Sequence, residues 1–148
     1  MRGPFAGDLQ AAYRGVDGGD IRWKLLLAPG AATFGPNAVD LLPHFTPNTC
    51  VCGYAWTRIV SDRDRTLFLY AGSDQRMAIW LNGEKVLTRD FYRAAVPDQD
   101  RVEARLRTGG NTVLVKLCHR FEGWSFCFRL GDEYGLPEED GLTYGFPQ

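Results

Sequence analysis

The chain has almost no net charge, which excludes partners that bind mainly through charge. Its 148 residues include 17 basic and 18 acidic side chains, giving a formal net charge of −1. The basic residues are scattered and form no run. Neither nucleic acid nor an anionic membrane surface is therefore an expected partner, because both attract clustered Lys and Arg.

Long apolar runs are also missing. A membrane-spanning helix needs about 18 or more consecutive apolar residues, and no segment approaches that length, so we expect no membrane span. Residues 1–10 lack the basic start and apolar stretch of a secretory signal. We therefore expect no signal peptide in this sequence. The compartment stays open, because such a leader can be removed.

Few residues are available for catalysis or metal binding. The chain has two histidines, His44 and His119, and no Gly-x-Ser-x-Gly sequence, whereas nucleophilic catalysis needs a base beside the nucleophile. The cysteines lack the Cys-x2-Cys spacing of a zinc knuckle. We therefore expect a protein that is not an enzyme, with no catalytic residue, no metal ligand and no cofactor. Structural calcium remains an alternative at the loop carboxylate pairs Asp62/Asp64 and Asp98/Asp100.

What the chain does have is a series of short strand-like segments separated by turns. Aromatic and β-branched residues are dense at 50–60, 66–71, 76–81, 84–88, 101–106, 112–118 and 125–130. Asn82-Gly83 lies between two apolar runs, which is the strongest short signal for a β-hairpin because both residues tolerate a positive φ. Six or more such strands, with Gly, Asn and Asp in the turns, predict an all-β sandwich or barrel.

The domain organisation follows from where this pattern begins and ends. Residues 1–20 are Gly-rich and weakly patterned, so we expect an N-terminal arm or lead-in. Residues 21–131 carry the strands of the β-sandwich domain. Residues 132–148 are acidic and rich in Gly and Pro, and are expected to form a C-terminal surface tail. The total length fits one domain.

The last two strands can be aligned if Glu122-Gly123 forms a two-residue turn. His119 and its apolar neighbours then share one face, where His119 is expected to be a packing residue. Cys118 lies opposite Cys127 in this register, at a pair whose Cα atoms are about 4.5 Å apart, the short end of the disulfide range. A Cys118–Cys127 disulfide and two free thiols are the alternatives. Cys50 and Cys52 are two apart on one strand and are not expected to bond each other.

The segment Leu67–Val86, LFLYAGSDQRMAIWLNGEKV, resembles the galactose-binding-like jelly-roll domains. The shared pattern is Gly72-Ser73-Asp74, Trp80-Leu81-Asn82-Gly83 and Val86, and it continues through Tyr92-Arg93-Ala94-Ala95, Pro97-Asp98-Gln99-Asp100, Gly110-Asn111, Lys116 and Trp124-x-Phe126. The likeness covers residues 38–131 and implies an antiparallel jelly-roll sandwich. Such domains include the sugar-binding domain of family 2 glycoside hydrolases and accessory modules of bacterial secreted proteins.

This resemblance implies a non-catalytic binding module, either carbohydrate-binding or associated with carbohydrate as part of a larger carbohydrate-active enzyme. It also implies an extracellular or periplasmic location. Aromatic rings can stack on a sugar while Asp and Arg bond its hydroxyls. The expected ligand-binding edge consists of Asp74, Arg76, Arg89, Tyr92, Arg93 and Trp124.

Two alternatives stay open. Trp124, beside a predicted turn, fits core packing as well as ligand stacking. The chain could also be a structural or protein-interaction subunit that uses the jelly roll as a scaffold, with its arm and tail docked on a partner protein. One departure from the family pattern argues against ligand binding by the loop before the final strand. Many relatives have a Gly/Asn-rich loop there, whereas this chain has the tighter and bulkier Cys118-His119-Arg120-Phe121-Glu122-Gly123.

Overall fold

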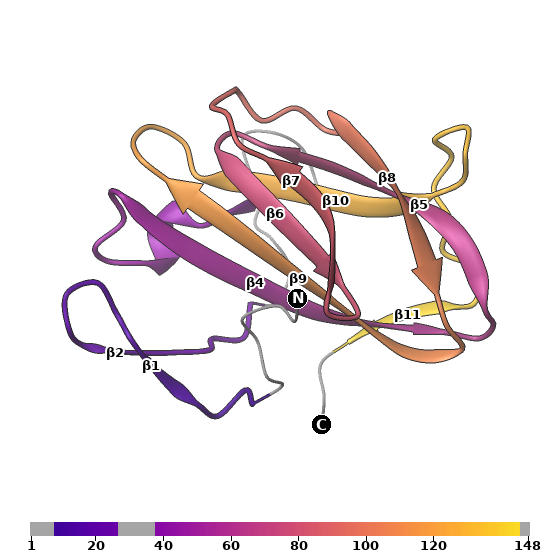
Figure 1. Cartoon of the computed structure of the whole chain (residues 1–148), viewed down its shortest axis with the longest axis horizontal. Coiled ribbons are helices and arrows are strands. Elements are labelled where there is room, and N and C mark those ends of the chain that lie inside the picture. Colours follow the sequence, from indigo (N-terminus) through magenta and orange to yellow (C-terminus); the bar gives the residue numbers. More distant parts are fainter. Residues whose placement is uncertain (1–7, 27–37, 146–148) are drawn as a thin grey trace.

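The chain folds into two antiparallel sheets that stack as a sandwich (Figure 1). This computed structural model describes residues 8–26 and 38–145. One sheet has four strands in the order β3 (Ala38–Asp40), β10 (Ser125–Gly131), β5 (Arg65–Ser73) and β8 (Asp100–Leu106). The other has five, in the order β11 (Leu142–Gly145), β4 (Val51–Ser61), β9 (Gly109–His119), β6 (Arg76–Leu81) and β7 (Glu84–Arg89). The predicted all-β antiparallel sandwich is confirmed.

Smaller elements surround the sandwich. A separate two-stranded ribbon, β1 (Ala12–Arg14) and β2 (Asp20–Arg22), precedes it, and a short 3-10 turn, η1 (Leu42–His44), follows β3. The ribbon spans the boundary that the sequence placed at residue 20. In the described parts of the chain, no helix is long and apolar enough to cross a membrane.

The core lies between the two sheets because each strand turns one apolar face inward. Along β9, every second side chain from Asn111 to His119 is buried, as expected for a strand with one face on a core. Ile59 of β4 and Ile79 of β6 join this cluster from the same sheet, and Leu69 of β5 joins it from the other. The period-two pattern of the sequence thus identifies the buried face.

The Asn82-Gly83 hairpin is present between β6 and β7. Asn82 has φ 51° and Gly83 has φ 82°, the two positive values that a type I′ turn requires. Leu81 lies opposite Glu84 across the turn. The Asn82 side chain also accepts a hydrogen bond from the Thr112 amide at 2.9 Å, so the turn is held against β9.

The predicted pairing of the last two strands is wrong. Strand β9 lies between β4 and β6, whereas β10 lies between β3 and β5 in the other sheet. The residues between β9 and β10 therefore cross from one sheet to the other. Their apolar faces meet across the core, which satisfies the same alternation of apolar residues that suggested a hairpin.

This crossing also corrects the predicted disulfide. Cys118 faces Cys52 of β4 and is bonded to it, whereas Cys127 faces Gly72 of β5. Cys127 is a free, buried cysteine, and Cys50 is free and exposed. Cys50 and Cys52 are not bonded to each other, as expected. The partner predicted for Cys118 is wrong because local patterns do not show that β9 pairs with the distant strand β4 rather than with the next strand along the chain.

The segment after residue 131 takes part in the fold. Strand β11 pairs antiparallel with the end of β4, with Leu142 opposite Ser61. The connection before it is also fixed, because the Tyr70 hydroxyl donates to the Asp132 carbonyl at 2.6 Å and Arg129 Nη2 donates to the Gly135 carbonyl at 2.8 Å. The region expected as a surface tail therefore supplies an edge strand.

Candidate functional site

Three connections lie at the end of the sandwich where β9 ends and β10 begins (Figure 1). These are the β5–β6 turn, the β7–β8 loop over residues 90–99 and the β9–β10 crossing over residues 120–124. Aromatic and arginine side chains in or beside them contact one another. We call the four side chains Arg76, Tyr92, Phe121 and Arg120 the loop-end column. Arg76 begins β6 directly after the first turn, Tyr92 lies in the β7–β8 loop, and Arg120 and Phe121 lie in the β9–β10 crossing.

Three ring contacts join the members of the column in series. The Arg76 guanidinium carbon lies over the Tyr92 ring, 5.5 Å from its centroid. The Tyr92 and Phe121 rings are stacked, with centroids 6.5 Å apart and planes at 16°. Arg120 lies over Phe121 at 5.7 Å. Because Tyr92 is 47% and Phe121 is 55% exposed, both rings remain available to a ligand.

Asp90 and Phe91 border the column. Arg76 Nε lies 2.8 Å from Asp90 Oδ1, and the Asp90 side chain is largely exposed. Phe91 is half exposed and lies under the Arg93 guanidinium at 5.2 Å. Such guanidinium–ring contacts are favourable because the ring face carries partial negative charge. The surface therefore offers aromatic faces beside groups that can donate or accept hydrogen bonds.

An ion-pair cluster centred on the buried Asp100 carboxylate lies beneath the β7–β8 loop. Asp100 accepts hydrogen bonds from Arg89 Nε at 2.6 Å and from Arg93, through both Nη1 and Nη2. Burial by itself raises the pKa of the Asp100 carboxyl, but the hydrogen bonds and charges of Arg93 and Arg89 outweigh it and hold that pKa below its usual range. The group is therefore an anion at neutral pH.

Asp74 faces inward, away from any ligand. Its carboxylate is buried and accepts hydrogen bonds from the Ser125 amide at 2.8 Å and the Ser125 hydroxyl at 3.0 Å. It thereby ties the β5–β6 turn to the first residue of β10.

Trp124 is also an interior residue, which decides between its two alternatives in favour of core packing. It is 1% exposed and stacks on His119 with centroids 5.2 Å apart, while Phe45 covers it at 5.3 Å. A Cβ atom at Gly53 would lie 2.8 Å from its ring. The expected packing role of His119 is confirmed, since it is buried with Nε2 3.1 Å from the Glu122 carbonyl oxygen.

The six residues expected at the binding edge thus fall into three groups. Arg76 and Tyr92 lie on the exposed surface, Arg89 and Arg93 support it from below, and Asp74 and Trp124 are buried. Sequence reasoning missed Asp90, Phe91, Arg120 and Phe121. Phe91 and Phe121 could have been found as lone aromatic residues in otherwise polar loops.

The carboxylates considered for calcium already have partners. Asp98 lies 2.8 Å from Arg129, Asp100 binds two arginines, and Asp64 accepts from the Thr108 amide at 2.6 Å. Within residues 8–26 and 38–145, no three His, Cys, Asp or Glu side chains are grouped so that they could hold a metal ion.

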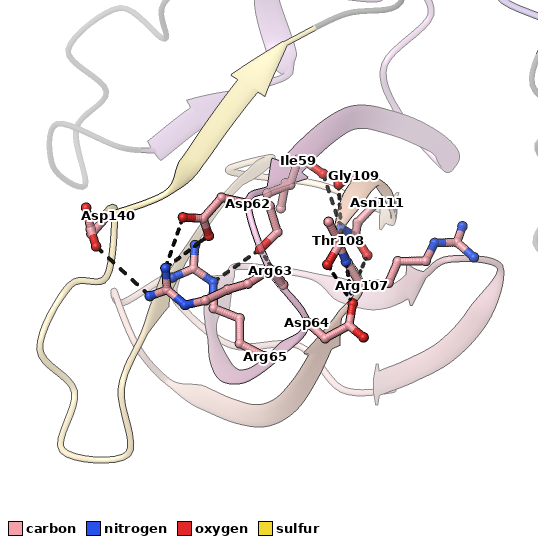
Figure 2. Close-up of polar contacts among 11 residues, drawn as sticks. Ile59, Asp62, Arg63, Asp64, Arg65, Arg107, Thr108, Gly109, Asn111 and Asp140 are labelled. Atoms are coloured by element: carbon pink, nitrogen blue, oxygen red, sulfur yellow. Dashed lines mark hydrogen bonds and ion pairs between the residues drawn. The ribbon is translucent and has the colours of Figure 1, made fainter.

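The opposite end of the sandwich is closed by internal polar contacts (Figure 2). Arg63 pairs with Asp62 at 3.0 Å and reaches Asp140 at 4.0 Å. Asp64 also accepts from the Thr108 hydroxyl at 2.9 Å, and Asn111 Nδ2 donates to the Arg107 carbonyl at 2.9 Å. The Asp64–Thr108 contacts join the β4–β5 and β8–β9 turns, and the Arg63–Asp140 contact joins the first of these turns to the connection before β11.

A cavity of about 640 Å³ lies apart from the loop-end column. It is lined by residues of the β1–β2 ribbon and of strands β4, β9 and β10, and Trp23, Phe45, Trp56 and Phe126 are among its lining residues. None of the four column residues lines it.

The fold has a counterpart among solved structures. No family model matches the chain, and no curated protein matches its sequence. The chain is similar to a structure described as a family 35 carbohydrate binding module from an environmental isolate, with a TM-score of 0.50 and 16% identity. The alignment covers 82% of this chain and 85% of that one. The chain shares the antiparallel β-sandwich fold of that structure. At this identity the likeness concerns the fold alone, and it agrees with the galactose-binding-like jelly roll expected from the sequence.

Proposed function

We propose that this chain is a non-catalytic carbohydrate-binding module and that its glycan lies on the loop-end column. The observation that carries the proposal is the exposed Tyr92–Phe121 pair, flanked by guanidinium groups and placed on loops of a sandwich whose fold occurs in such modules. Fold alone does not fix function, so the chemistry of this surface must support the assignment.

That chemistry suits a sugar. The apolar face of a pyranose ring packs on an exposed aromatic ring, while a few polar groups orient it through its hydroxyls. Tyr92 and Phe121 supply the rings. Asp90 can accept from hydroxyl groups, and Arg120 and Arg76 can donate to them. This combination needs no catalytic base, and the buried His119 lies between backbone carbonyl groups rather than at the surface.

Substitution of the two rings tests the proposal. Y92A and F121A are each expected to weaken glycan binding about tenfold. This ratio corresponds to a loss of about 1.4 kcal/mol in binding free energy, which is the size expected for one lost aromatic contact. A glycan array and affinity gels containing plant, algal or bacterial polysaccharides would first identify the ligand, and isothermal titration calorimetry would then give the affinities.

Y134A is the matched control. Tyr134 is the most exposed large hydrophobic side chain described and lies in the β10–β11 connection. It should bind like the wild type. A wild-type chain that no polysaccharide retains, or a control that loses as much affinity as Y92A, would count against this function.

A protein-interaction subunit is the second candidate function. The β1–β2 ribbon and the residues after it expose several apolar side chains, namely Tyr13, Val16, Ile21 and Leu25, and exposed apolar groups that lie together often mark protein contacts. Size-exclusion chromatography with light scattering, on the full chain and on a chain lacking residues 1–20, separates the candidates. An assembly that collapses on trimming supports this second function.

A further inference from the structure

We propose that Asp100 is the positioning residue of the loop-end column and that it acts through Arg89 and Arg93. This inference rests on the proposed function, since it explains how that binding surface keeps its shape. Asp100 itself touches no part of the surface: its side chain is 5% exposed, at the start of β8.

Two arginines converge on the Asp100 carboxylate. Arg89 ends β7, and Arg93 follows it four residues later across the loop tip formed by residues 90–92. Both guanidinium groups bond to Asp100, one through Nε at 2.6 Å and the other through two nitrogens. The two ends of the tip are therefore held at a single point.

Arg93 and Gln99 also fix the loop against the neighbouring β5–β6 turn. Arg93 Nε donates to the Ser73 carbonyl at 3.2 Å, and the Arg93 amide donates to the Asp74 carbonyl at 3.4 Å. The Gln99 side chain accepts from the Ser73 amide at 3.1 Å. Ser73 ends β5, just before the turn that leads to Arg76. Through Arg93, Asp100 therefore fixes the position of the loop tip, which carries Tyr92, relative to Arg76.

These bonds hold the loop tip in the shape that glycan binding requires before the glycan arrives. The tip carries Asp90, Phe91 and Tyr92, and Tyr92 must meet Phe121 from a different loop. A tip without its anchor would lose that alignment, and ordering it again on binding would lower affinity. The Arg93–Asp100 ion pair has little solvent exposure. It is suited to holding the tip because its hydrogen bonds are directional and its attraction is weakly screened by salt.

D100N tests the proposal, since it keeps the shape of the side chain and removes its charge. We expect about tenfold weaker glycan binding, lower heteronuclear ¹⁵N NOE values at residues 90–93, and loss of the NOE between the Tyr92 and Phe121 rings. The matched control is D98N, in the same loop, whose carboxylate pairs with Arg129. It should leave the tip and the affinity unchanged.

If D100N does not fold, R93K takes its place, because lysine keeps the charge but cannot bridge two carboxylate oxygens in Arg geometry. An unchanged tip and ring contact in the folded variant would overturn the inference. The NMR readouts need no ligand. A wild type that binds no glycan but shows the predicted tip changes would therefore refute the proposed function while leaving the role of Asp100 in place.

Discussion

At the scale of the residue, aromatic side chains of this chain divide by exposure into two roles. Trp124 is enclosed by His119 and Phe45, with Gly53 leaving room for its ring. Tyr92 and Phe121 touch each other in solvent-exposed loops. From the sequence alone, a Trp near a strand end and a Tyr in a loop are equally plausible sugar contacts. Only their burial or exposure in the folded chain distinguishes their roles.

Replacement of Trp124 should therefore affect stability. We expect W124A to lower the free energy of unfolding by about 3–5 kcal/mol, the range for removing a large buried aromatic side chain, because a cavity remains where the ring was. Urea denaturation followed by circular dichroism measures this change. Y134A should stay within about 0.5 kcal/mol of the wild type.

If W124A changed the free energy of unfolding only slightly and the folded variant lost glycan binding, Trp124 would instead belong to the binding surface. The same measurement on Y92A should show little loss of stability, because that ring is half exposed. If the structural assignment is right, W124A therefore loses stability, whereas Y92A loses glycan binding.

At the scale of the element, the neighbours of β9 determine its cysteine chemistry. Strand β9 pairs with β4 over the whole length of both strands, from Val51 opposite His119 to Ser61 opposite Gly109. That register places Cys52 and Cys118 face to face. Cys127 instead lies in the other sheet, where burial, aided by the Asp98 charge, raises the pKa of its thiol.

We expect the Cys52–Cys118 bond to stabilise the chain by about 4 kcal/mol, because it closes a loop of 66 residues in the unfolded state. Non-reducing peptide mapping should find this pair alone. The double variant C52A/C118A should unfold at a lower urea concentration than the wild type. The loss in its free energy of unfolding should account for most of this stabilisation.

Thiol labelling provides the internal control. Cys50 is exposed and should react with iodoacetamide in the folded protein, whereas Cys127 should react only after unfolding, since it is buried and its pKa is raised. A Cys118–Cys127 peptide in the map would contradict the strand order that places these residues in different sheets.

At the scale of the whole molecule, the two terminal regions differ in how they join the sandwich. The described N-terminal ribbon pairs strand to strand only with itself, as β1 with β2. The C-terminal region extends the five-stranded sheet through β11 and is bonded to β5 and β10 through Tyr70 and Arg129. Both were expected to be peripheral.

Truncation should reveal this difference. Removal of residues 132–148 is expected to lower Tm by more than 5 °C, because it exposes the edge of β4 and removes the Asp132 and Gly135 carbonyl groups to which Tyr70 and Arg129 donate. Removal of residues 1–20 should lower it by less. Differential scanning fluorimetry on both truncated chains measures this, and equal shifts would show that the ribbon is as integral as β11.

The sequence by itself determined the fold class, the Asn82-Gly83 hairpin and most strand positions, because alternating burial and turn residues act over a few neighbouring residues. It also determined the loops that form the candidate site. Tertiary structure decided which strands lie side by side, and therefore the partner of Cys118, the burial of Asp74 and Trp124, and the meeting of Tyr92 with Phe121. These features join residues distant in the chain, and the same period-two pattern is satisfied by a hairpin or by a crossing between sheets.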